Sequence, residues 1–181
     1  MEKGKFLLLG FILIIANSCG TLETPNYVGP GKFFPTKNSV PVGRTSIVDD
    51  IKLRWPVHSP RITQHFKPGS KRTRHQGIDL GGSKNTPIYS AHDGKVIYAG
   101  QGFRGYGKLV IVENPNGYAT FYAHLNTINT REGKWVMGGE KIGGMGRTGR
   151  ATGVHLHFEL RIAEVAVNPY SYFPTPRLSS K

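Results

Sequence analysis

The chain has 181 residues, of which 38% are hydrophobic, and its 24 lysines and arginines against 11 aspartates and glutamates give a net charge of +13. This length fits one compact domain with a modest additional segment, and the single cysteine, Cys19, excludes a disulfide within the chain. The charge favours a polyanionic partner, namely nucleic acid, anionic lipid or cell-wall polymer, although it can also serve solubility alone. Neither zinc-finger spacing nor an RNP-type motif occurs, so we expect no nucleic-acid partner.

Residues 1–18 have the composition of a secretory signal peptide. Lys3 and Lys5 precede an apolar run over 6–16, which is shorter than the about 20 residues that a membrane-spanning helix needs. Ala16 and Ser18 then fit a cleavage site directly before Cys19, an arrangement that resembles a bacterial lipoprotein signal. We therefore expect an exported protein of the cell envelope, anchored to a membrane through a lipid on Cys19 or, alternatively, simply secreted.

Residues 19–52 differ in character from the rest of the chain. They are rich in proline and glycine and show neither the period of a strand nor that of a helix. We interpret them as a tether or loosely ordered arm, although apolar residues such as Phe33 and Phe34 leave open that parts of it dock on the domain. The folded domain is expected over 53–175, followed by a short tail over 176–181.

Short strand patterns follow one another through this domain and are separated by turn signals. Asp93-Gly94 and the Asn-Pro-Asn-Gly sequence at 114–117 are typical of tight turns between antiparallel strands. No helical periodicity is visible, so we predict a mainly β fold built on an antiparallel sheet, with few or no helices beyond the signal segment. Two G-x-G-x-x-G matches, at 100–105 and 144–149, lead into strand patterns and are interpreted as turns, not nucleotide-binding loops. The candidate strands lie at 61–66, 75–82, 87–92, 94–100, 108–113, 118–124, 133–142 and 154–163.

The stretch GVHLHFEL at 153–160 has two chemically different faces. Because side chains alternate along a strand, His155, His157 and Glu159 share one face. The opposite face is apolar throughout, which favours burial in the core. The same alternation predicts that one face of 118–124 carries Tyr118, Thr120, Tyr122 and His124.

His75 and Asp79 form a second polar pair, on the segment HQGIDLGG. The two side chains share a face whether this segment is extended or helical, and its glycines favour the extended form. Together with His155 and His157 they are candidate zinc ligands, since a catalytic zinc takes three protein ligands and leaves one position for water. Zinc lowers the pKa of a bound water from about 15.7 to about 7, which supplies a nucleophile for hydrolysis. The helical H-E-x-x-H signature is absent, so a peptidase of another lineage is expected, with its metal site in a groove of the sheet domain.

These motifs resemble the lysostaphin-type, or LytM-type, zinc metallopeptidases over about residues 53–173. The resemblance rests on H-x-x-x-D at 75–79, YAHL at 122–125, TGVHLHFEL at 152–160, RGYGKLVIV at 104–112, the turn region 138–149 and VNP at 167–169. It implies one zinc ion held by His75, Asp79 and His157. His124 and His155 would be catalytic, orienting or deprotonating the water and stabilising charge on the peptide carbonyl. The implied substrates are peptide bonds in the cross-links or stem peptides of bacterial peptidoglycan.

Other interpretations compete with this one. The chain could be a non-enzymatic envelope module that activates other wall hydrolases, as some relatives without ligands do, or a basic surface protein with incidental histidines. The complete ligand set favours the enzyme, which we expect to be a monomer. Outside this set, we expect Glu159 to pair with a basic neighbour, and Tyr106 and Tyr122 either to line the groove or to pack in the core. Ordinary surface or core positions are expected for His58, His65 and His92.

Overall fold

The computed structural model describes residues 50–70 and 74–174. Within these residues it contains eleven strands, one short 3₁₀ helix, η3 (Pro169–Tyr172), and no α-helix, which confirms the predicted mainly β fold. No helix in this part of the chain has the length and apolar character needed to cross a membrane. The predicted signal peptide, Cys19, nearly all of the arm and the tail over 176–181 lie outside the described residues.

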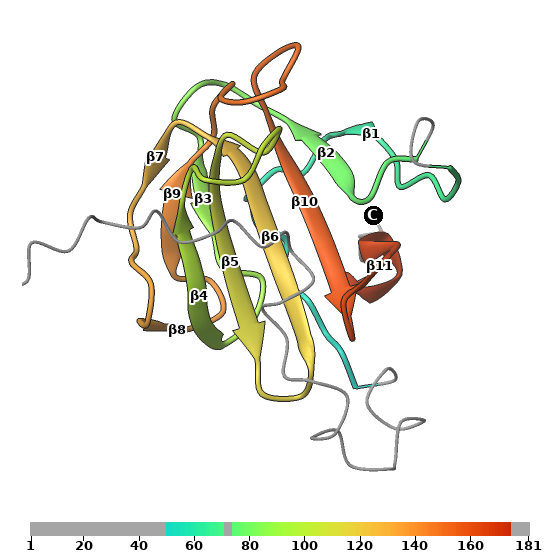
Figure 1. The fold of residues 1–181 in the computed structure, drawn as a ribbon, viewed down its shortest axis with the longest axis vertical. Coiled ribbons are helices and arrows are strands. Elements are labelled where there is room, and N and C mark those ends of the chain that lie inside the picture. The colour runs from blue at the N-terminus through green and yellow to red at the C-terminus, as the bar shows by residue number, and fades with distance from the viewer. Residues whose placement is uncertain (1–49, 71–73, 175–181) are drawn as a thin grey trace, which may run out of the picture.

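Most strands belong to one antiparallel sheet, and the two longest lie side by side near its middle (Figure 1). Its order is β1 (Ile62–Gln64), β2 (Ile78–Gly81), β10 (His155–Ile162), β6 (Tyr118–Leu125), β5 (Lys108–Asn114), β4 (Gly94–Gly100) and β8 (Trp135–Val136), and β11 (Val165–Val167) pairs with β10. A smaller sheet has the order β3 (Pro87–Tyr89), β9 (Lys141–Gly144) and β7 (Thr127–Ile128). The predicted polar segments therefore become neighbours, because β10 lies between β2 and β6.

The two faces of β10 differ as the sequence predicts. Leu156, Phe158 and Leu160 are fully buried in the main hydrophobic core, to which the smaller sheet contributes Ile88 and Ile142. Burial of each such side chain contributes about 1.5–3 kcal/mol, which keeps β10 in this orientation. The opposite face therefore carries the polar residues of β10, beside a smaller apolar cluster from β5, β6 and the loop before β5.

The core also extends beyond the predicted start of the domain. Ile51 and Leu53 are buried in the main core, and the Leu53 backbone donates a hydrogen bond to the Tyr172 carbonyl at 2.9 Å. The last residues of the predicted arm are thus packed on the folded domain.

His124 does not share a face with Tyr122, so this prediction of strict alternation along β6 is wrong. Lys108 on β5 pairs with Leu125 on β6, and Val110 pairs with Tyr122. One residue lies between the paired positions on β5 but two lie between them on β6, so β6 carries an extra residue. His124 has a φ of 60°, in the left-handed region, within this bulge. A β-bulge redirects the side chains next to it. The Tyr122 side chain stays in the main core, while His124 turns to the polar face of β10.

Gly77 allows β2 to approach β10 closely. A Cβ atom added there would lie 2.1 Å from the Phe158 carbonyl oxygen, which is backbone and cannot move aside. We expect Gly77→Ala to lower the free energy of unfolding by about 1–3 kcal/mol or more, because the two strands must separate. Chemical denaturation measures this change. Gly153→Ala is the matched control, since no atom lies within 4 Å of its added Cβ, and equal denaturation midpoints for the two variants would contradict the prediction.

Candidate metal centre

Three side chains from two strands and one loop converge on a single point. Asp79 on β2 lies directly across from His157 on β10, and His75 precedes β2 in a backbone bridge with Lys67. His157 Nδ1 lies 2.9 Å from Asp79 Oδ1 and 3.0 Å from His75 Nε2, and His75 Nε2 lies 3.1 Å from Asp79 Oδ1. Tetrahedral ligands at about 2.0 Å from a zinc ion would be about 3.3 Å apart. The triangle therefore has nearly the dimensions that one metal ion requires.

The hydrogen bonds behind the two histidines fix which ring nitrogen faces this point. His75 Nδ1 donates to the His65 carbonyl at 2.9 Å, and His157 Nε2 donates to Glu159 Oε1 at 3.0 Å. Each ring thus directs its other nitrogen, with a lone pair in the neutral form, toward Asp79. Such outer partners are typical of histidines that bind metal ions.

The electrostatics of the cluster favour a positive charge at its centre. Burial raises the pKa of Asp79, but hydrogen bonds from His157 and His75 outweigh it and hold that pKa well below its usual range. Burial lowers the pKa of His157, yet hydrogen bonds with Asp79 and Glu159 raise it to about 9. The two carboxylates stabilise a cation here, and a metal ion competes with protons for the same nitrogen. The donor set of two imidazoles and one carboxylate fits zinc.

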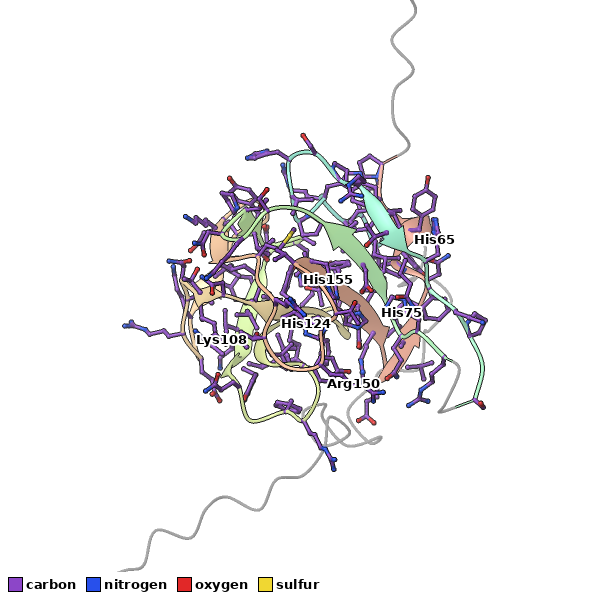
Figure 2. The ribbon with its side chains drawn as sticks, turned by 90° about the horizontal axis from the view of Figure 1, so that it is seen from above. His65, His75, Lys108, His124, Arg150 and His155 are labelled. Atoms are coloured by element: carbon purple, nitrogen blue, oxygen red, sulfur yellow. The ribbon has the colours of Figure 1, made fainter. Side chains whose placement is uncertain are left out.

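His124 and His155 lie next to this cluster and face each other. Their ring centroids are 4.8 Å apart, and Figure 2 shows them close to His75 in the view from above. His155 Nδ1 donates to the Gly153 carbonyl at 3.0 Å and its Nε2 lies 3.7 Å from Asp79 Oδ2. His124 Nδ1 donates to the Thr148 carbonyl at 2.8 Å.

These backbone hydrogen bonds determine what the two rings can do. Burial lowers the pKa of His124 to about 4, so its imidazole is neutral near pH 7. Because Nδ1 holds the hydrogen, the lone pair of a neutral ring is on Nε2 in both residues. An unprotonated Nε2 beside a metal site is a proton acceptor, which is the group that hydrolysis by water needs.

Several neighbouring residues are placed as predicted, and others were missed. Glu159 pairs with the basic Arg161 at 2.7 Å, as expected, but its bond with His157 was not predicted. Tyr122 packs in the core, where its hydroxyl accepts from the Ala91 backbone at 2.7 Å, whereas the Tyr106 hydroxyl reaches Glu159 at 2.8 Å. Alternation along 155–161 puts His157, Glu159 and Arg161 on one face, and this pattern could have predicted that the three side chains are in contact. Of the remaining histidines, His92 is buried in the core, and His58 and His65 are exposed.

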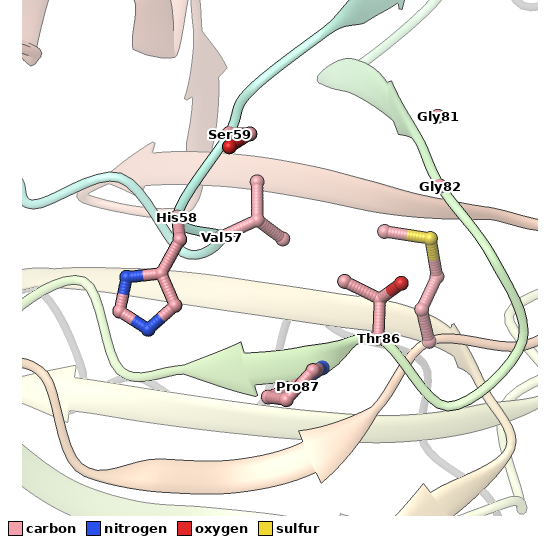
Figure 3. A pocket seen from close by; sticks show the side chains of 8 residues that line it. Val57, His58, Ser59, Gly81, Gly82, Thr86 and Pro87 are labelled. Carbon is pink, nitrogen blue, oxygen red and sulfur yellow. The ribbon is translucent and has the colours of Figure 1, made fainter.

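A pocket of about 360 Å³ lies beyond the end of β2 (Figure 3). It contains none of the five predicted site residues, but Gly81 in its wall pairs directly with His155 on β10. The pocket therefore borders the strand end on which His155 lies. Its lining is formed by Val57, His58, Ser59, Gly81, Gly82, Thr86, Pro87 and Met145.

The profile of peptidase family M23 matches residues 73–169, a range that includes all five predicted site residues and more than half of the chain. The chain belongs to peptidase family M23. The resemblance to lysostaphin-type zinc metallopeptidases is thereby confirmed, and lysostaphin is among the solved structures with a similar fold. This family is zinc-dependent, and within the described residues the M23 domain offers one cluster able to hold a metal ion, formed by His75, Asp79 and His157.

Relatives of this M23 protein differ in function. The murein hydrolase activator NlpD of Escherichia coli is 40% identical over 121 residues, which cover 67% of this chain and 31% of NlpD. The DD-carboxypeptidase/endopeptidase Mpg of Neisseria meningitidis is 45% identical over 106 residues, which cover 58% of this chain and 24% of Mpg. A zinc-containing peptidase from Vibrio cholerae superposes with a TM-score of 0.58 at 36% identity, covering 62% of this chain and 37% of that one. The match thus spans less than a third of either sequence relative.

Proposed function

We propose that this protein is a zinc-dependent endopeptidase that hydrolyses peptide bonds in the cross-links or stem peptides of bacterial peptidoglycan. The observation that supports it best is the convergence of three ligand atoms within 2.9–3.1 Å of one another. Both histidines in this triangle have their second nitrogen engaged in a hydrogen bond, so the nitrogen that faces the centre is the one a metal ion would bind. Membership of family M23 and the likeness to a zinc-containing peptidase support the same function.

In this proposal His75, Asp79 and His157 hold one zinc ion. When bound, zinc supplies Lewis acidity, which makes water more acidic and a carbonyl more electrophilic. His155 and His124 act beside it through Nε2. One of these nitrogens accepts the proton of the attacking water, and the N–H so formed can be donated to the leaving amine nitrogen or toward the charge on the carbonyl oxygen.

Exposed positive charge beside His124 supports a wall substrate. The loops at 101–107 and 146–153 pack together, since the Arg150 backbone donates to the Gly105 carbonyl at 2.8 Å, and they hold His124 through two backbone carbonyls. Arg104, Arg147 and Arg150 are exposed on these loops and form no ion pair within 50–70 and 74–174. Guanidinium groups suit the carboxylates of peptide stems.

The remaining assignments follow from the sequence. We propose a signal peptide over 1–18, an arm over 19–52 and the peptidase domain over 53–175. The exported protein would be a monomer in the cell envelope, anchored by a lipid on Cys19, with peptidoglycan as its partner. The match to NlpD favours a second candidate function, namely activation of other murein hydrolases.

Digestion of isolated sacculi separates the two functions. We expect the purified protein to release muropeptides on its own, to stop when zinc is removed by a chelator and to recover when zinc is restored. Mass spectrometry of defined muropeptides would identify the cleaved bond. Release only after a second wall hydrolase is added, with the same yield in chelator-treated protein, would instead support the activator.

A further inference from the structure

A closed network of two buried side chains and one half-buried side chain holds the ring nitrogen of His157 that does not face Asp79. Glu159 Oε1 accepts from His157 Nε2 at 3.0 Å and from the Tyr106 hydroxyl at 2.8 Å. Glu159 Oε2 accepts from Arg161 Nε at 2.7 Å, and Arg161 Nη2 donates to the Tyr106 hydroxyl at 3.1 Å. The side chain of Glu159 is 1% exposed and that of Arg161 7%. The carboxylate is therefore held by the protein itself, away from solvent.

The strand geometry explains why such long polar side chains fit here. His157, Glu159 and Arg161 follow one another at every second position of β10, so they share a face. Two of the three residues opposite them on β6 have only a methyl side chain, which leaves room, and the third lies with its ring 4.5 Å from the Arg161 guanidinium in a cation–π contact. The three residues opposite are Ala123, Phe121 and Ala119.

The arrangement has a direct consequence for His157. An ionised carboxylate only accepts hydrogen bonds, so the hydrogen between the two residues belongs to Nε2. Nδ1 then carries the lone pair of the neutral ring, and it is the atom that lies 2.9 Å from Asp79 and 3.0 Å from His75. Arg161 keeps Glu159 in place as an ion pair, since an unpaired charge buried here would cost several kcal/mol.

We infer that Glu159, held by Arg161 and Tyr106, is the positioning residue for the metal ligand His157. This inference rests on the proposed function, because it gives Glu159 a part in the metal centre. It differs from a purely structural role, in which the Glu159–Arg161 pair would stabilise the sheet and leave metal binding unaffected.

The test is the zinc affinity of Glu159→Gln in the full chain, measured by competition with a chromophoric chelator. Glutamine keeps the shape but presents a neutral amide, which accepts more weakly from His157 or turns its NH₂ group toward it. We expect zinc to bind about 10–100-fold more weakly, as changes behind a ligand histidine typically do. The visible spectrum of the Co²⁺-loaded variant should change as well. Glu140→Gln is the matched control and should bind zinc normally, because the Glu140 carboxylate contacts Lys134 and the Met137 backbone and lies outside the metal cluster.

Each outcome bears on one claim. Unchanged zinc affinity and an unchanged Co²⁺ spectrum in Glu159→Gln, with lowered thermal stability, would overturn the positioning role alone. Failure of the unsubstituted chain to bind zinc would overturn the proposed function itself. If Glu159→Gln does not fold, Tyr106→Phe takes its place, because it keeps the ring and removes one donor to the same oxygen. A several-fold loss of zinc affinity is then expected, and unchanged affinity would refute the inference.

Discussion

Replacing His157 with alanine is expected to remove bound zinc and peptide hydrolysis together. His157 Nδ1 is within 3.0 Å of both other ligand atoms, so its loss opens one corner of the triangle. The loss of zinc affinity should exceed the about 100-fold upper range seen for residues behind a ligand. Zinc content after dialysis and muropeptide release from sacculi measure the two effects on one preparation.

Two further variants make this result specific. Asp79→Asn keeps the side-chain shape and replaces the carboxylate by a weaker ligand, so it should lose zinc without a change of volume in the core. His65→Ala is the matched control, because it removes an exposed imidazole but keeps the backbone carbonyl that orients His75. Full hydrolysis by His157→Ala would contradict the ligand assignment and leave the histidines incidental.

Replacing His155 or His124 with alanine is expected to separate metal binding from turnover. Neither ring belongs to the ligand triangle, and each is held by a backbone hydrogen bond at Nδ1, so that Nε2 is the nitrogen that can take part in proton transfer. Loss of a general acid or base lowers kcat by about 10²–10⁴-fold. Zinc content should stay that of the unsubstituted chain, since all three ligands remain.

Zinc content and turnover, measured on the same preparation, again distinguish a ligand from a proton-transfer residue. Zinc lost from His155→Ala or His124→Ala would contradict the assignment and make the missing ring a ligand. Turnover retained by His124→Ala alone would assign the proton transfer to His155. His92→Gln is a suitable control, because His92 is a buried histidine hydrogen-bonded to Thr120 in the core and lies outside the cluster.

Much of the site can be predicted from local patterns. The alternation of GVHLHFEL separates an apolar face from a polar one, and the structure has Leu156, Phe158 and Leu160 in the core with the histidines on the other side. The extended form of HQGIDLGG, predicted from its glycines, is also observed, as β2 pairs with β10. Both predictions succeed because side-chain direction along a strand is a local property. The roles of the five residues remain predictions.

The position of His124 could not be predicted from local pattern. Alternation alone puts it with Tyr122, whereas the extra residue in β6 turns it toward His155. The bulge is defined by the pairing of β6 with β5, so the residues that specify it are spread over both strands. A left-handed φ at a histidine, here 60°, leaves no mark that a single sequence would show.

The amino-acid sequence alone therefore established the β fold, the family and the two segments that carry the candidate ligands, because these depend on alternation and on short motifs. The tertiary structure decided which atoms meet. His75 and His157 are 82 residues apart, and their contact depends on the pairing of β2 with β10. Glu159 and Arg161 already share a face with His157 along β10, whereas only the folded chain brings Tyr106 from the loop before β5 to Glu159. Strand register arises from contacts across the whole sheet, and for that reason only the folded chain reveals it.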